Sequence, residues 1–298
     1  MLCSGIIHVM LKVKKPILKI HSWGGLGSQL QALSFYMLVQ AKFPTRKIEL
    51  VLHSSGITKR ESEINFLKGQ INIRTVEDYI DNQTNSTDDL LHLRFIKYFQ
   101  KPMHSLLNFC KVVISDEKNV MKIMPWTTDI RCTYSKINLN SEFIKRLGLL
   151  LGFNFIQVDK NIIGVHYRAG DLFTSKRDAL IPLKIIVNQI ENLNEGQIRP
   201  KKVLFFSDSD LDLVYLENNL NSEFEFRSTD TLNTIFELLS SNVFIGTNSK
   251  VSLWVAIFKY GFKIPGIILL PNTMLPNFFS LINPFEHVED FIIDSYSY

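Results

Sequence analysis

The stretch NIIGVHYRAGD, residues 161–171, places an apolar run directly before a cluster of polar side chains. Two later stretches have the same form, KVLFFSDSD at residues 202–210 and NVFIGTNSK at residues 242–250. Short apolar runs predict further strands at residues 223–227 and 267–270, and helical spacing of apolar residues predicts helices at residues 182–193, 211–219, 231–240 and 250–260. This alternation of strands and helices predicts an α/β fold with a doubly wound parallel sheet.

The first half of the chain begins in a similar way. Residues 16–21 are typical of a strand, a glycine-rich turn follows at residues 24–29, and residues 30–41 have helical spacing. The pattern further predicts a strand at residues 47–53 and helices at residues 91–113 and 142–153. We therefore expect two Rossmann-like domains, residues 1–157 and 158–298, facing an interdomain cleft. In such sheets, ligands bind at the carboxyl ends of the strands, where the polar clusters of this chain lie.

The composition is that of an ordinary globular protein, with 46% apolar and 21% charged residues in a chain of 298. The three cysteines, Cys3, Cys110 and Cys132, are too few and too scattered for a disulfide framework or a zinc site. No apolar run reaches the roughly 18–20 residues that span a bilayer. The apolar start precedes Lys14 and Lys15, whereas a signal peptide carries its positive charge first. These features predict a cytoplasmic protein.

Charge is distributed unevenly along the chain. Residues 1–155 hold 21 Lys and Arg against 12 Asp and Glu, a net charge of +9, whereas residues 156–298 have a net charge of −5. A basic first half suits an anionic partner such as a phospholipid surface, a lipid pyrophosphate or a nucleic acid, although an uneven solubilising surface explains it equally well. Basic and aromatic residues are not interleaved as in a nucleic-acid platform, so we expect no nucleic-acid partner.

Two of the polar clusters suit a bound diphosphate. In the first, Arg168 follows His166, and an arginine can grip a diphosphate with two parallel hydrogen bonds and neutralise the charge that develops as it departs. In the second, small hydroxyl residues precede a helix that begins at Lys250, and the first N–H groups of a helix attract phosphate oxygens. A solvated strand end and simple helix capping are the structural alternatives.

Two further clusters are open to more than one interpretation. Asp208 and Asp210 form an Asp-x-Asp pair, which can hold a divalent metal against a nucleotide diphosphate, cap a helix, or accept hydrogen bonds from a nucleobase. The turn at residues 24–29 lets backbone approach a ligand, but it is not G-x-G-x-x-G and has no P-loop lysine. A tight connection between a strand and a helix explains it as well.

Taken in order, these clusters resemble the fucosyltransferase superfamily, which includes α1,2-, α1,6- and protein O-fucosyltransferases. GLGSQL at residues 25–30 resembles the family's G-x-G-N-Q-(L/M) turn, HYRAGD at residues 166–171 its H-x-R-x-G-D motif, and FSD at residues 206–208 its (F/Y)-(S/T)-D-D segment. Residues 230–254 resemble its last block, an acidic residue and an apolar helix followed by S-N-S-x-x-S-x-W. This last block is most similar to that of bacterial α1,2-fucosyltransferases.

The resemblance implies a GT-B-like fold and an inverting glycosyltransferase. It implies transfer of L-fucose, or a related deoxysugar, from a GDP-sugar to a glycan acceptor in bacterial surface polysaccharide synthesis, with no cofactor and no obligatory metal. Arg168 would grip the diphosphate as a catalytic residue, and Asp171 is the nearest acidic residue of the motif for the general base. The donor-binding residues implied are His166, Arg168, Asp208, Asn248, Ser249, Lys250, Ser252, Gly25, Gly27 and Ser28.

An acceptor carried on a lipid pyrophosphate at the inner membrane face would suit the basic first half. Three positions depart from the family pattern: Ser28 stands where Asn is common, Ala169 where many α1,2 enzymes have a second Arg, and Ser209 where a second Asp often lies. Two alternatives therefore stay open, a metal-dependent glycosyltransferase that uses Asp208 and Asp210 with another nucleotide sugar, and a non-catalytic nucleotide- or glycan-binding relative.

Overall fold

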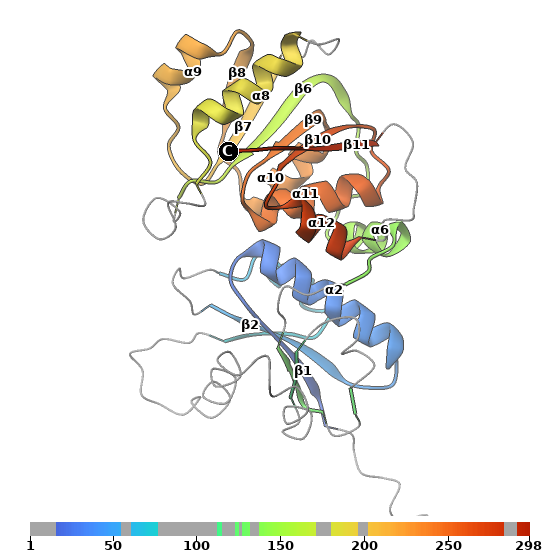
Figure 1. The fold of residues 1–298 in the computed structure, drawn as a ribbon. Helices are drawn as coiled ribbons and strands as arrows, with labels where there is room; N and C mark the ends of the chain where they lie inside the picture. Colours follow the sequence, from blue (N-terminus) through green and yellow to red (C-terminus); the bar gives the residue numbers. More distant parts are fainter. Residues whose placement is uncertain are drawn as a thin grey trace, which may run out of the picture. The chain divides into compact units, whose positions relative to one another are not determined.

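The computed structural model describes residues 16–54, 61–76, 112–114, 123–124, 127–131, 137–170, 180–195, 202–282 and 291–298. The chain divides into two compact units, Met1–Ser135 and Lys136–Tyr298, each with its own parallel sheet (Figure 1). The predicted α/β class with two Rossmann-like units is therefore confirmed, and the cleft expected between them stays a prediction.

Unit 1 is a five-stranded sheet in the order β3-β2-β1-β5-β4, and every strand pair in it is parallel. Its strands are β1 (Leu18–Trp23), β2 (Ile48–His53), β3 (Ile73–Val76), β4 (Val112–Ile114) and β5 (Asp129–Arg131). Helix α2 (Leu26–Lys42) follows the glycine turn and packs on β1 and β2, and a short 3-10 helix, η2 (Asn65–Leu67), precedes β3.

Unit 2 is a six-stranded parallel sheet in the order β11-β10-β9-β6-β7-β8. Its strands are β6 (Asp159–Tyr167), β7 (Lys202–Ser207), β8 (Glu223–Arg227), β9 (Ser241–Gly246), β10 (Gly266–Pro271) and β11 (Phe291–Tyr296). Its helices are α6 (Ser141–Leu150), α8 (Leu183–Glu195), α9 (Leu213–Asn219), α10 (Thr231–Leu239), α11 (Lys250–Gly261) and α12 (Leu275–Leu281). Numbered within the unit, the strand order is 3-2-1-4-5-6, that of a dinucleotide-binding fold.

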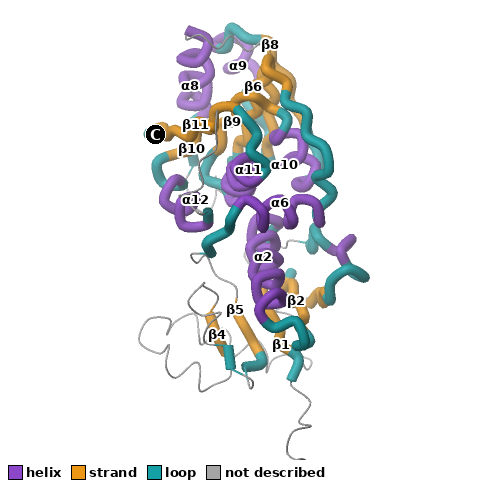
Figure 2. The backbone as a smooth tube through the Cα atoms, turned by 90° about the vertical axis from the view of Figure 1, so that its right-hand side faces the viewer, coloured by secondary structure: helices purple, strands orange, loops and turns teal. Residues whose placement is uncertain are grey.

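The core of unit 2 lies around the strands that carry the polar clusters. Ile163, Val165, Phe205, Val243 and Ile245 are fully buried, and each such side chain contributes about 1.5–3 kcal/mol through burial. On another side of the unit, α11 packs against α6, α10 and α12 (Figure 2). Strands β6, β7 and β9 are therefore held firmly by the core, which fixes the places where the polar turns begin.

The structure differs from the sequence predictions in several elements. Val112 and Val113 belong to strand β4 rather than to the end of a helix, and the other residues of that predicted helix lie outside the described residues. Helix α6 ends at Leu150 because Gly152 takes the left-handed conformation, with φ of 92°, that closes many helices. Helix α12 and strand β11 were not predicted. Helix α6 belongs to the second compact unit, Lys136–Tyr298, because it packs on α11, and the domain division between residues 157 and 158 stays a prediction.

Candidate functional site

The candidate site lies at the carboxyl edge of the unit 2 sheet. Three polar turns follow β6, β7 and β9, which are neighbours in the sheet. Strands β6 and β9 are the pair at which the direction of strand progression reverses, and ligands of open α/β sheets bind at this switch point. The sequence-predicted residues of unit 2 that the structure describes, from His166 to Ser252, come from the end of β6, from these turns and from the helix that follows β9.

Thr247 joins the two strands at the switch point. Its Oγ1 accepts a hydrogen bond from the backbone N–H of Arg168 at 3.0 Å and donates one to the carbonyl of His166, also at 3.0 Å. Its side chain is only 1% exposed. The sequence placed Thr247 in a polar cluster, but nothing in the local pattern indicated this connecting role. The two hydrogen bonds of Thr247 therefore fix the backbone position of Arg168, from which its side chain extends.

Asp208 fixes the rest of the same turn. Its Oδ1 accepts hydrogen bonds from the backbone N–H groups of Ala169 and Gly170, each at 3.0 Å. A Cβ atom on Gly170 would come within 2.7 Å of Asp208 Oδ2, so a larger residue here would force the carboxylate to shift. The same Oδ2 lies 4.0 Å from Nε of Arg168. Asp208 thus accepts two hydrogen bonds from the backbone of the turn, and its carboxylate also lies near the Arg168 side chain.

His166 lies behind the turn rather than at its surface. It is 8% exposed, and its Nδ1 is 2.8 Å from Oγ of Ser252, which is itself fully buried. Burial lowers the pKa of His166 to about 4, although the nearby Asp208 carboxylate acts in the opposite direction and Arg168 adds to the lowering. The imidazole is therefore neutral at pH 7. Ser252 Oγ also accepts a hydrogen bond from the N–H of Thr247 at 3.0 Å. His166 and Ser252, two of the predicted donor-binding residues, therefore lie behind the turn and support it.

The turn after β9 leads into the amino end of α11. Ser249 caps this helix, because its Oγ accepts a hydrogen bond from the N–H of Val251 at 3.1 Å. The Asn248 side chain accepts a hydrogen bond from Thr273 at 2.7 Å and donates one to the Tyr298 hydroxyl. Lys250 is the first residue of the helix and is partly exposed. Through Thr247, the amino end of α11 is linked directly to the turn that carries Arg168.

In unit 1, the glycine turn leads into helix α2, whose first turn binds a carboxylate of the chain itself. Gly25 is the N-cap residue of α2, Gly27 is buried and Ser28 is partly exposed. The N–H of Leu26, in the first turn of the helix, donates to the Glu63 carboxylate at 3.0 Å. The positive end of α2 therefore already holds a carboxylate from the chain itself.

One predicted catalytic residue, Asp171, lies outside the described residues. Asp210, the second residue of the Asp-x-Asp pair, is exposed after β7. Within the described ranges, no three His, Cys, Asp or Glu side chains are grouped as a metal site requires. Among the helices in those ranges, none combines the length and the apolar character needed to cross a bilayer.

No protein-family model matches this chain, and no curated protein matches its sequence. Among solved structures, E. coli heptosyltransferase WaaC with ADP is 11% identical, with a TM-score of 0.44 over 94% of this chain and 93% of that one. E. coli ADP-heptose lipopolysaccharide heptosyltransferase II is 13% identical, with a TM-score of 0.42 over 94% and 90% of the two chains. POFUT1 in complex with GDP-fucose is 10% identical, with a TM-score of 0.36 over 82% and 95%. The likeness is remote, and the function of the site is inferred from its own residues.

Proposed function

We propose that the chain is an inverting glycosyltransferase that binds the diphosphate of a nucleotide sugar at the carboxyl edge of unit 2. One observation carries this proposal: Arg168 stands at the switch point on a turn whose three successive N–H groups are held by Thr247 and Asp208. The backbone of Arg168 is bonded to Thr247, three residues before the start of α11, so we expect the guanidinium and the amino end of α11 to act on one anion.

This arrangement suits the chemistry of inverting transfer. An acceptor hydroxyl attacks the anomeric carbon, the bond from that carbon to the diphosphate oxygen breaks, and the nucleoside diphosphate leaves with the bonding electrons. The hydroxyl proton passes to a base. Arg168 stabilises the negative charge that grows on the departing diphosphate, and it needs little rearrangement because its turn is already fixed. Asp171 stays the sequence candidate for the base.

The donor proposed is GDP-fucose or a related GDP-deoxysugar. This rests on the resemblance of HYRAGD at residues 166–171 and of the block at 230–254 to fucosyltransferase motifs. The acceptor proposed is a glycan of a bacterial surface polysaccharide, carried on a lipid pyrophosphate that the basic first half of the chain meets at the inner face of the membrane. Arg168 and α11 are proposed to neutralise the diphosphate without an obligatory metal.

Calorimetric titration of the whole chain with GDP and with UDP, each with and without EDTA, tests the proposal. We expect GDP to bind in the presence of EDTA and the Arg168→Ala variant to bind it roughly 10- to 100-fold more weakly, since a hydrogen bond to a charged group contributes about 1.5–3 kcal/mol. Arg146→Ala, which removes an exposed arginine from α6 of the same unit, is the matched control and should bind GDP like the native chain.

Other results would point elsewhere. A preference for UDP that requires a metal would replace the proposal by the metal-dependent enzyme with Asp208 and Asp210. Binding of GDP by a chain that does not turn over GDP-fucose with any glycan acceptor would favour the non-catalytic relative.

A further inference from the structure

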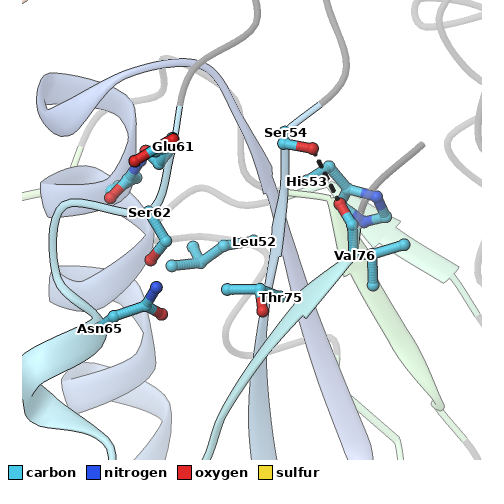
Figure 3. A pocket seen from close by; sticks show the side chains of 9 residues that line it. Leu52, His53, Ser54, Glu61, Ser62, Asn65, Thr75 and Val76 are labelled. Atoms are coloured by element: carbon cyan, nitrogen blue, oxygen red, sulfur yellow. Dashed lines mark hydrogen bonds between the residues drawn. The ribbon is translucent and has the colours of Figure 1, made fainter. Parts of the chain in front are cut away.

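Both units tie the ends of their strands together with side-chain hydrogen bonds, but over different spans of the sheet. In unit 1, Oγ of Ser54, directly after β2, donates to the carbonyl of Val76 in the neighbouring strand β3 at 3.4 Å, beside a pocket of about 180 Å³ (Figure 3). In unit 2, the hydroxyl of Tyr296, at the end of β11, donates to the carbonyl of Gly246, at the end of β9, at 2.6 Å. Strand β10 lies between these two strands, so the Tyr296 side chain reaches across a whole strand to the switch point.

The Tyr296 hydroxyl is a buried donor. The residue is 4% exposed and belongs to the core cluster that includes Ile245 and Leu269. Burial, with smaller contributions from Tyr298 and Tyr167, raises the pKa of Tyr296 well above its ordinary value. The hydroxyl therefore keeps its proton at any physiological pH and donates it to the carbonyl oxygen that it faces.

The peptide group that joins Gly246 to Thr247 is held on both sides. Its carbonyl accepts the hydrogen bond from Tyr296, and its N–H donates to Oγ of Ser252 at 3.0 Å. The backbone is also closely packed, because a Cβ atom on Gly246 would come within 2.8 Å of side-chain atoms of Leu270 and Ser252. Since a peptide group is planar, it cannot turn without weakening both hydrogen bonds.

The orientation of this peptide group decides where the Thr247 side chain lies. Oγ1 of Thr247 accepts the N–H of Arg168 at 3.0 Å. The contacts therefore form one continuous chain, from the Tyr296 hydroxyl through the backbone of Thr247 to the backbone of Arg168. The N–H groups of the next two residues of the turn instead end on Asp208. The chain from Tyr296 thus acts on the first amide of the turn and leaves the other two to Asp208.

We propose that Tyr296 is a positioning residue for the diphosphate site: its hydroxyl fixes the peptide group that places Thr247, and Thr247 places Arg168. Tyr296 acts through Thr247 rather than by contact with the substrate. The inference rests on the proposed function only for the identity of the bound anion as a diphosphate, since the effect of Tyr296 on the Arg168 amide can be measured without any ligand. A residue of the edge strand β11, an element that the sequence did not predict, thereby fixes the turn at the switch point.

Hydrogen exchange measured by NMR on the whole chain tests the chain of contacts. Tyr296→Phe removes the hydroxyl and keeps the ring in the core, so the variant should fold. Its Arg168 amide should exchange roughly 2- to 10-fold faster than in the native chain, as expected for one weakened hydrogen bond. The amides of Ala169 and Gly170, which Asp208 holds, should exchange at native rates. Equal acceleration of all three amides, as from general destabilisation, or an unchanged rate at Arg168 would overturn the proposal.

Calorimetric titration with GDP measures the consequence for binding. Tyr296→Phe should bind GDP roughly 3- to 10-fold more weakly than the native chain. Thr247→Val, which removes the acceptor of the Arg168 N–H, should weaken binding at least as much. Adding Tyr296→Phe to Thr247→Val should cause no further loss, because both changes act through the same bond. Losses that add in the double variant would show that Tyr296 does not act through Thr247.

Tyr36→Phe, in α2 of unit 1, is the matched control, because Tyr36 is also buried and its hydroxyl is hydrogen-bonded to the backbone of Asn72. It should leave GDP affinity and the exchange of the Arg168 amide unchanged, and an equal loss of affinity in this control would count against the role of Tyr296. A native chain that does not bind GDP would refute the proposed function, whereas a native chain and a Tyr296→Phe variant that bind GDP equally well would refute the positioning role alone.

Discussion

The two units use the same sequence of a strand, a turn and a helix, but they leave opposite electrostatic environments at the helix start. In unit 2, α11 is capped by the neutral hydroxyl of Ser249, and the neighbouring turn presents Arg168. In unit 1, α2 receives the carboxylate of Glu63, which lies 37 residues further along the chain than Leu26. A glycine-rich turn before a helix therefore does not by itself mark an anion site, because a distant carboxylate can satisfy the same N–H groups.

The side-chain contacts between the central strands also differ between the two units. In unit 2, the uncharged Thr247 connects β9 to β6. In unit 1, Nε2 of His21 on β1 lies 2.9 Å from Asp129 on β5, and Nδ1 of His21 lies 2.9 Å from His53 on β2. Burial acts to raise the pKa of Asp129, but hydrogen bonds from His21 and Thr128 hold it below its usual range. Unit 1 thus encloses its own charge, whereas the Arg168 side chain of unit 2 stays 26% exposed.

The largest expected effect concerns the carboxylate of Asp208. Asp208→Ala leaves the N–H groups of Ala169 and Gly170 without their acceptor, so the turn loosens and affinity for GDP should fall roughly 100-fold, about 3 kcal/mol. Asp208→Asn keeps an oxygen at the same place and should retain most of the affinity. Calorimetric titration of both variants checks this. An equal, complete loss in Asp208→Asn would contradict a backbone-holding role and favour metal binding.

The next effect is the pH dependence that His166 confers on unit 2. Its pKa in the folded chain is about 4 against an ordinary 6.5, so the unfolded chain binds more protons between these values. The free energy of unfolding should therefore be insensitive to this group above pH 6.5 and fall by about 2–3 kcal/mol as the pH drops towards 4. His166→Asn should lose less stability over this range. Denaturant unfolding at a series of pH values tests the difference, and parallel curves would refute it.

The smallest effect tests whether unit 1 can be made to resemble unit 2. Glu63→Ala removes the carboxylate from the start of α2 and should cost about 1 kcal/mol of stability. The amino end of α2, no longer occupied by a carboxylate, should then bind sulfate, so sulfate should raise the melting temperature of this variant more than that of the native chain. Glu217→Ala, on α9, is the control for the general effect of sulfate. Identical sulfate responses in all three chains would show that the turn of unit 1 cannot hold an anion.

How far the sequence predicted this molecule depends on how each element is buried. Strands β6, β7, β9 and β10 were placed within about two residues, because strands covered on both faces form continuous apolar runs. Strand β11 was missed because its side chains are mostly only partly buried or exposed. Strand β4 was assigned to a helix because three apolar residues carry no periodicity.

The sequence predicted which residues of unit 2 lie together at the sheet edge, but not which of them support the Arg168 turn. The sequence brought Arg168, Asp208 and Asn248 to one sheet edge because each follows an apolar strand. Binding of the donor by His166 and Ser252 stays a prediction. Their burial and their contact with each other could not be predicted, since burial depends on side-chain direction and on neighbouring strands. The bonds of Gln29 to Glu61 and Glu63 join residues 32 and 34 positions apart, a tertiary contact that no local pattern contains.

The backbone hydrogen bonds of the Arg168 turn make its amide hydrogen exchange a measure of whether the turn stays closed. The N–H groups of Arg168, Ala169 and Gly170 all end on side chains that belong to the turns after other strands. Each amide hydrogen can exchange with solvent only when a neighbouring turn moves away from it. Hydrogen exchange at three consecutive amides therefore measures whether the edges of three strands open together, and ligand binding at this edge should slow all three at once.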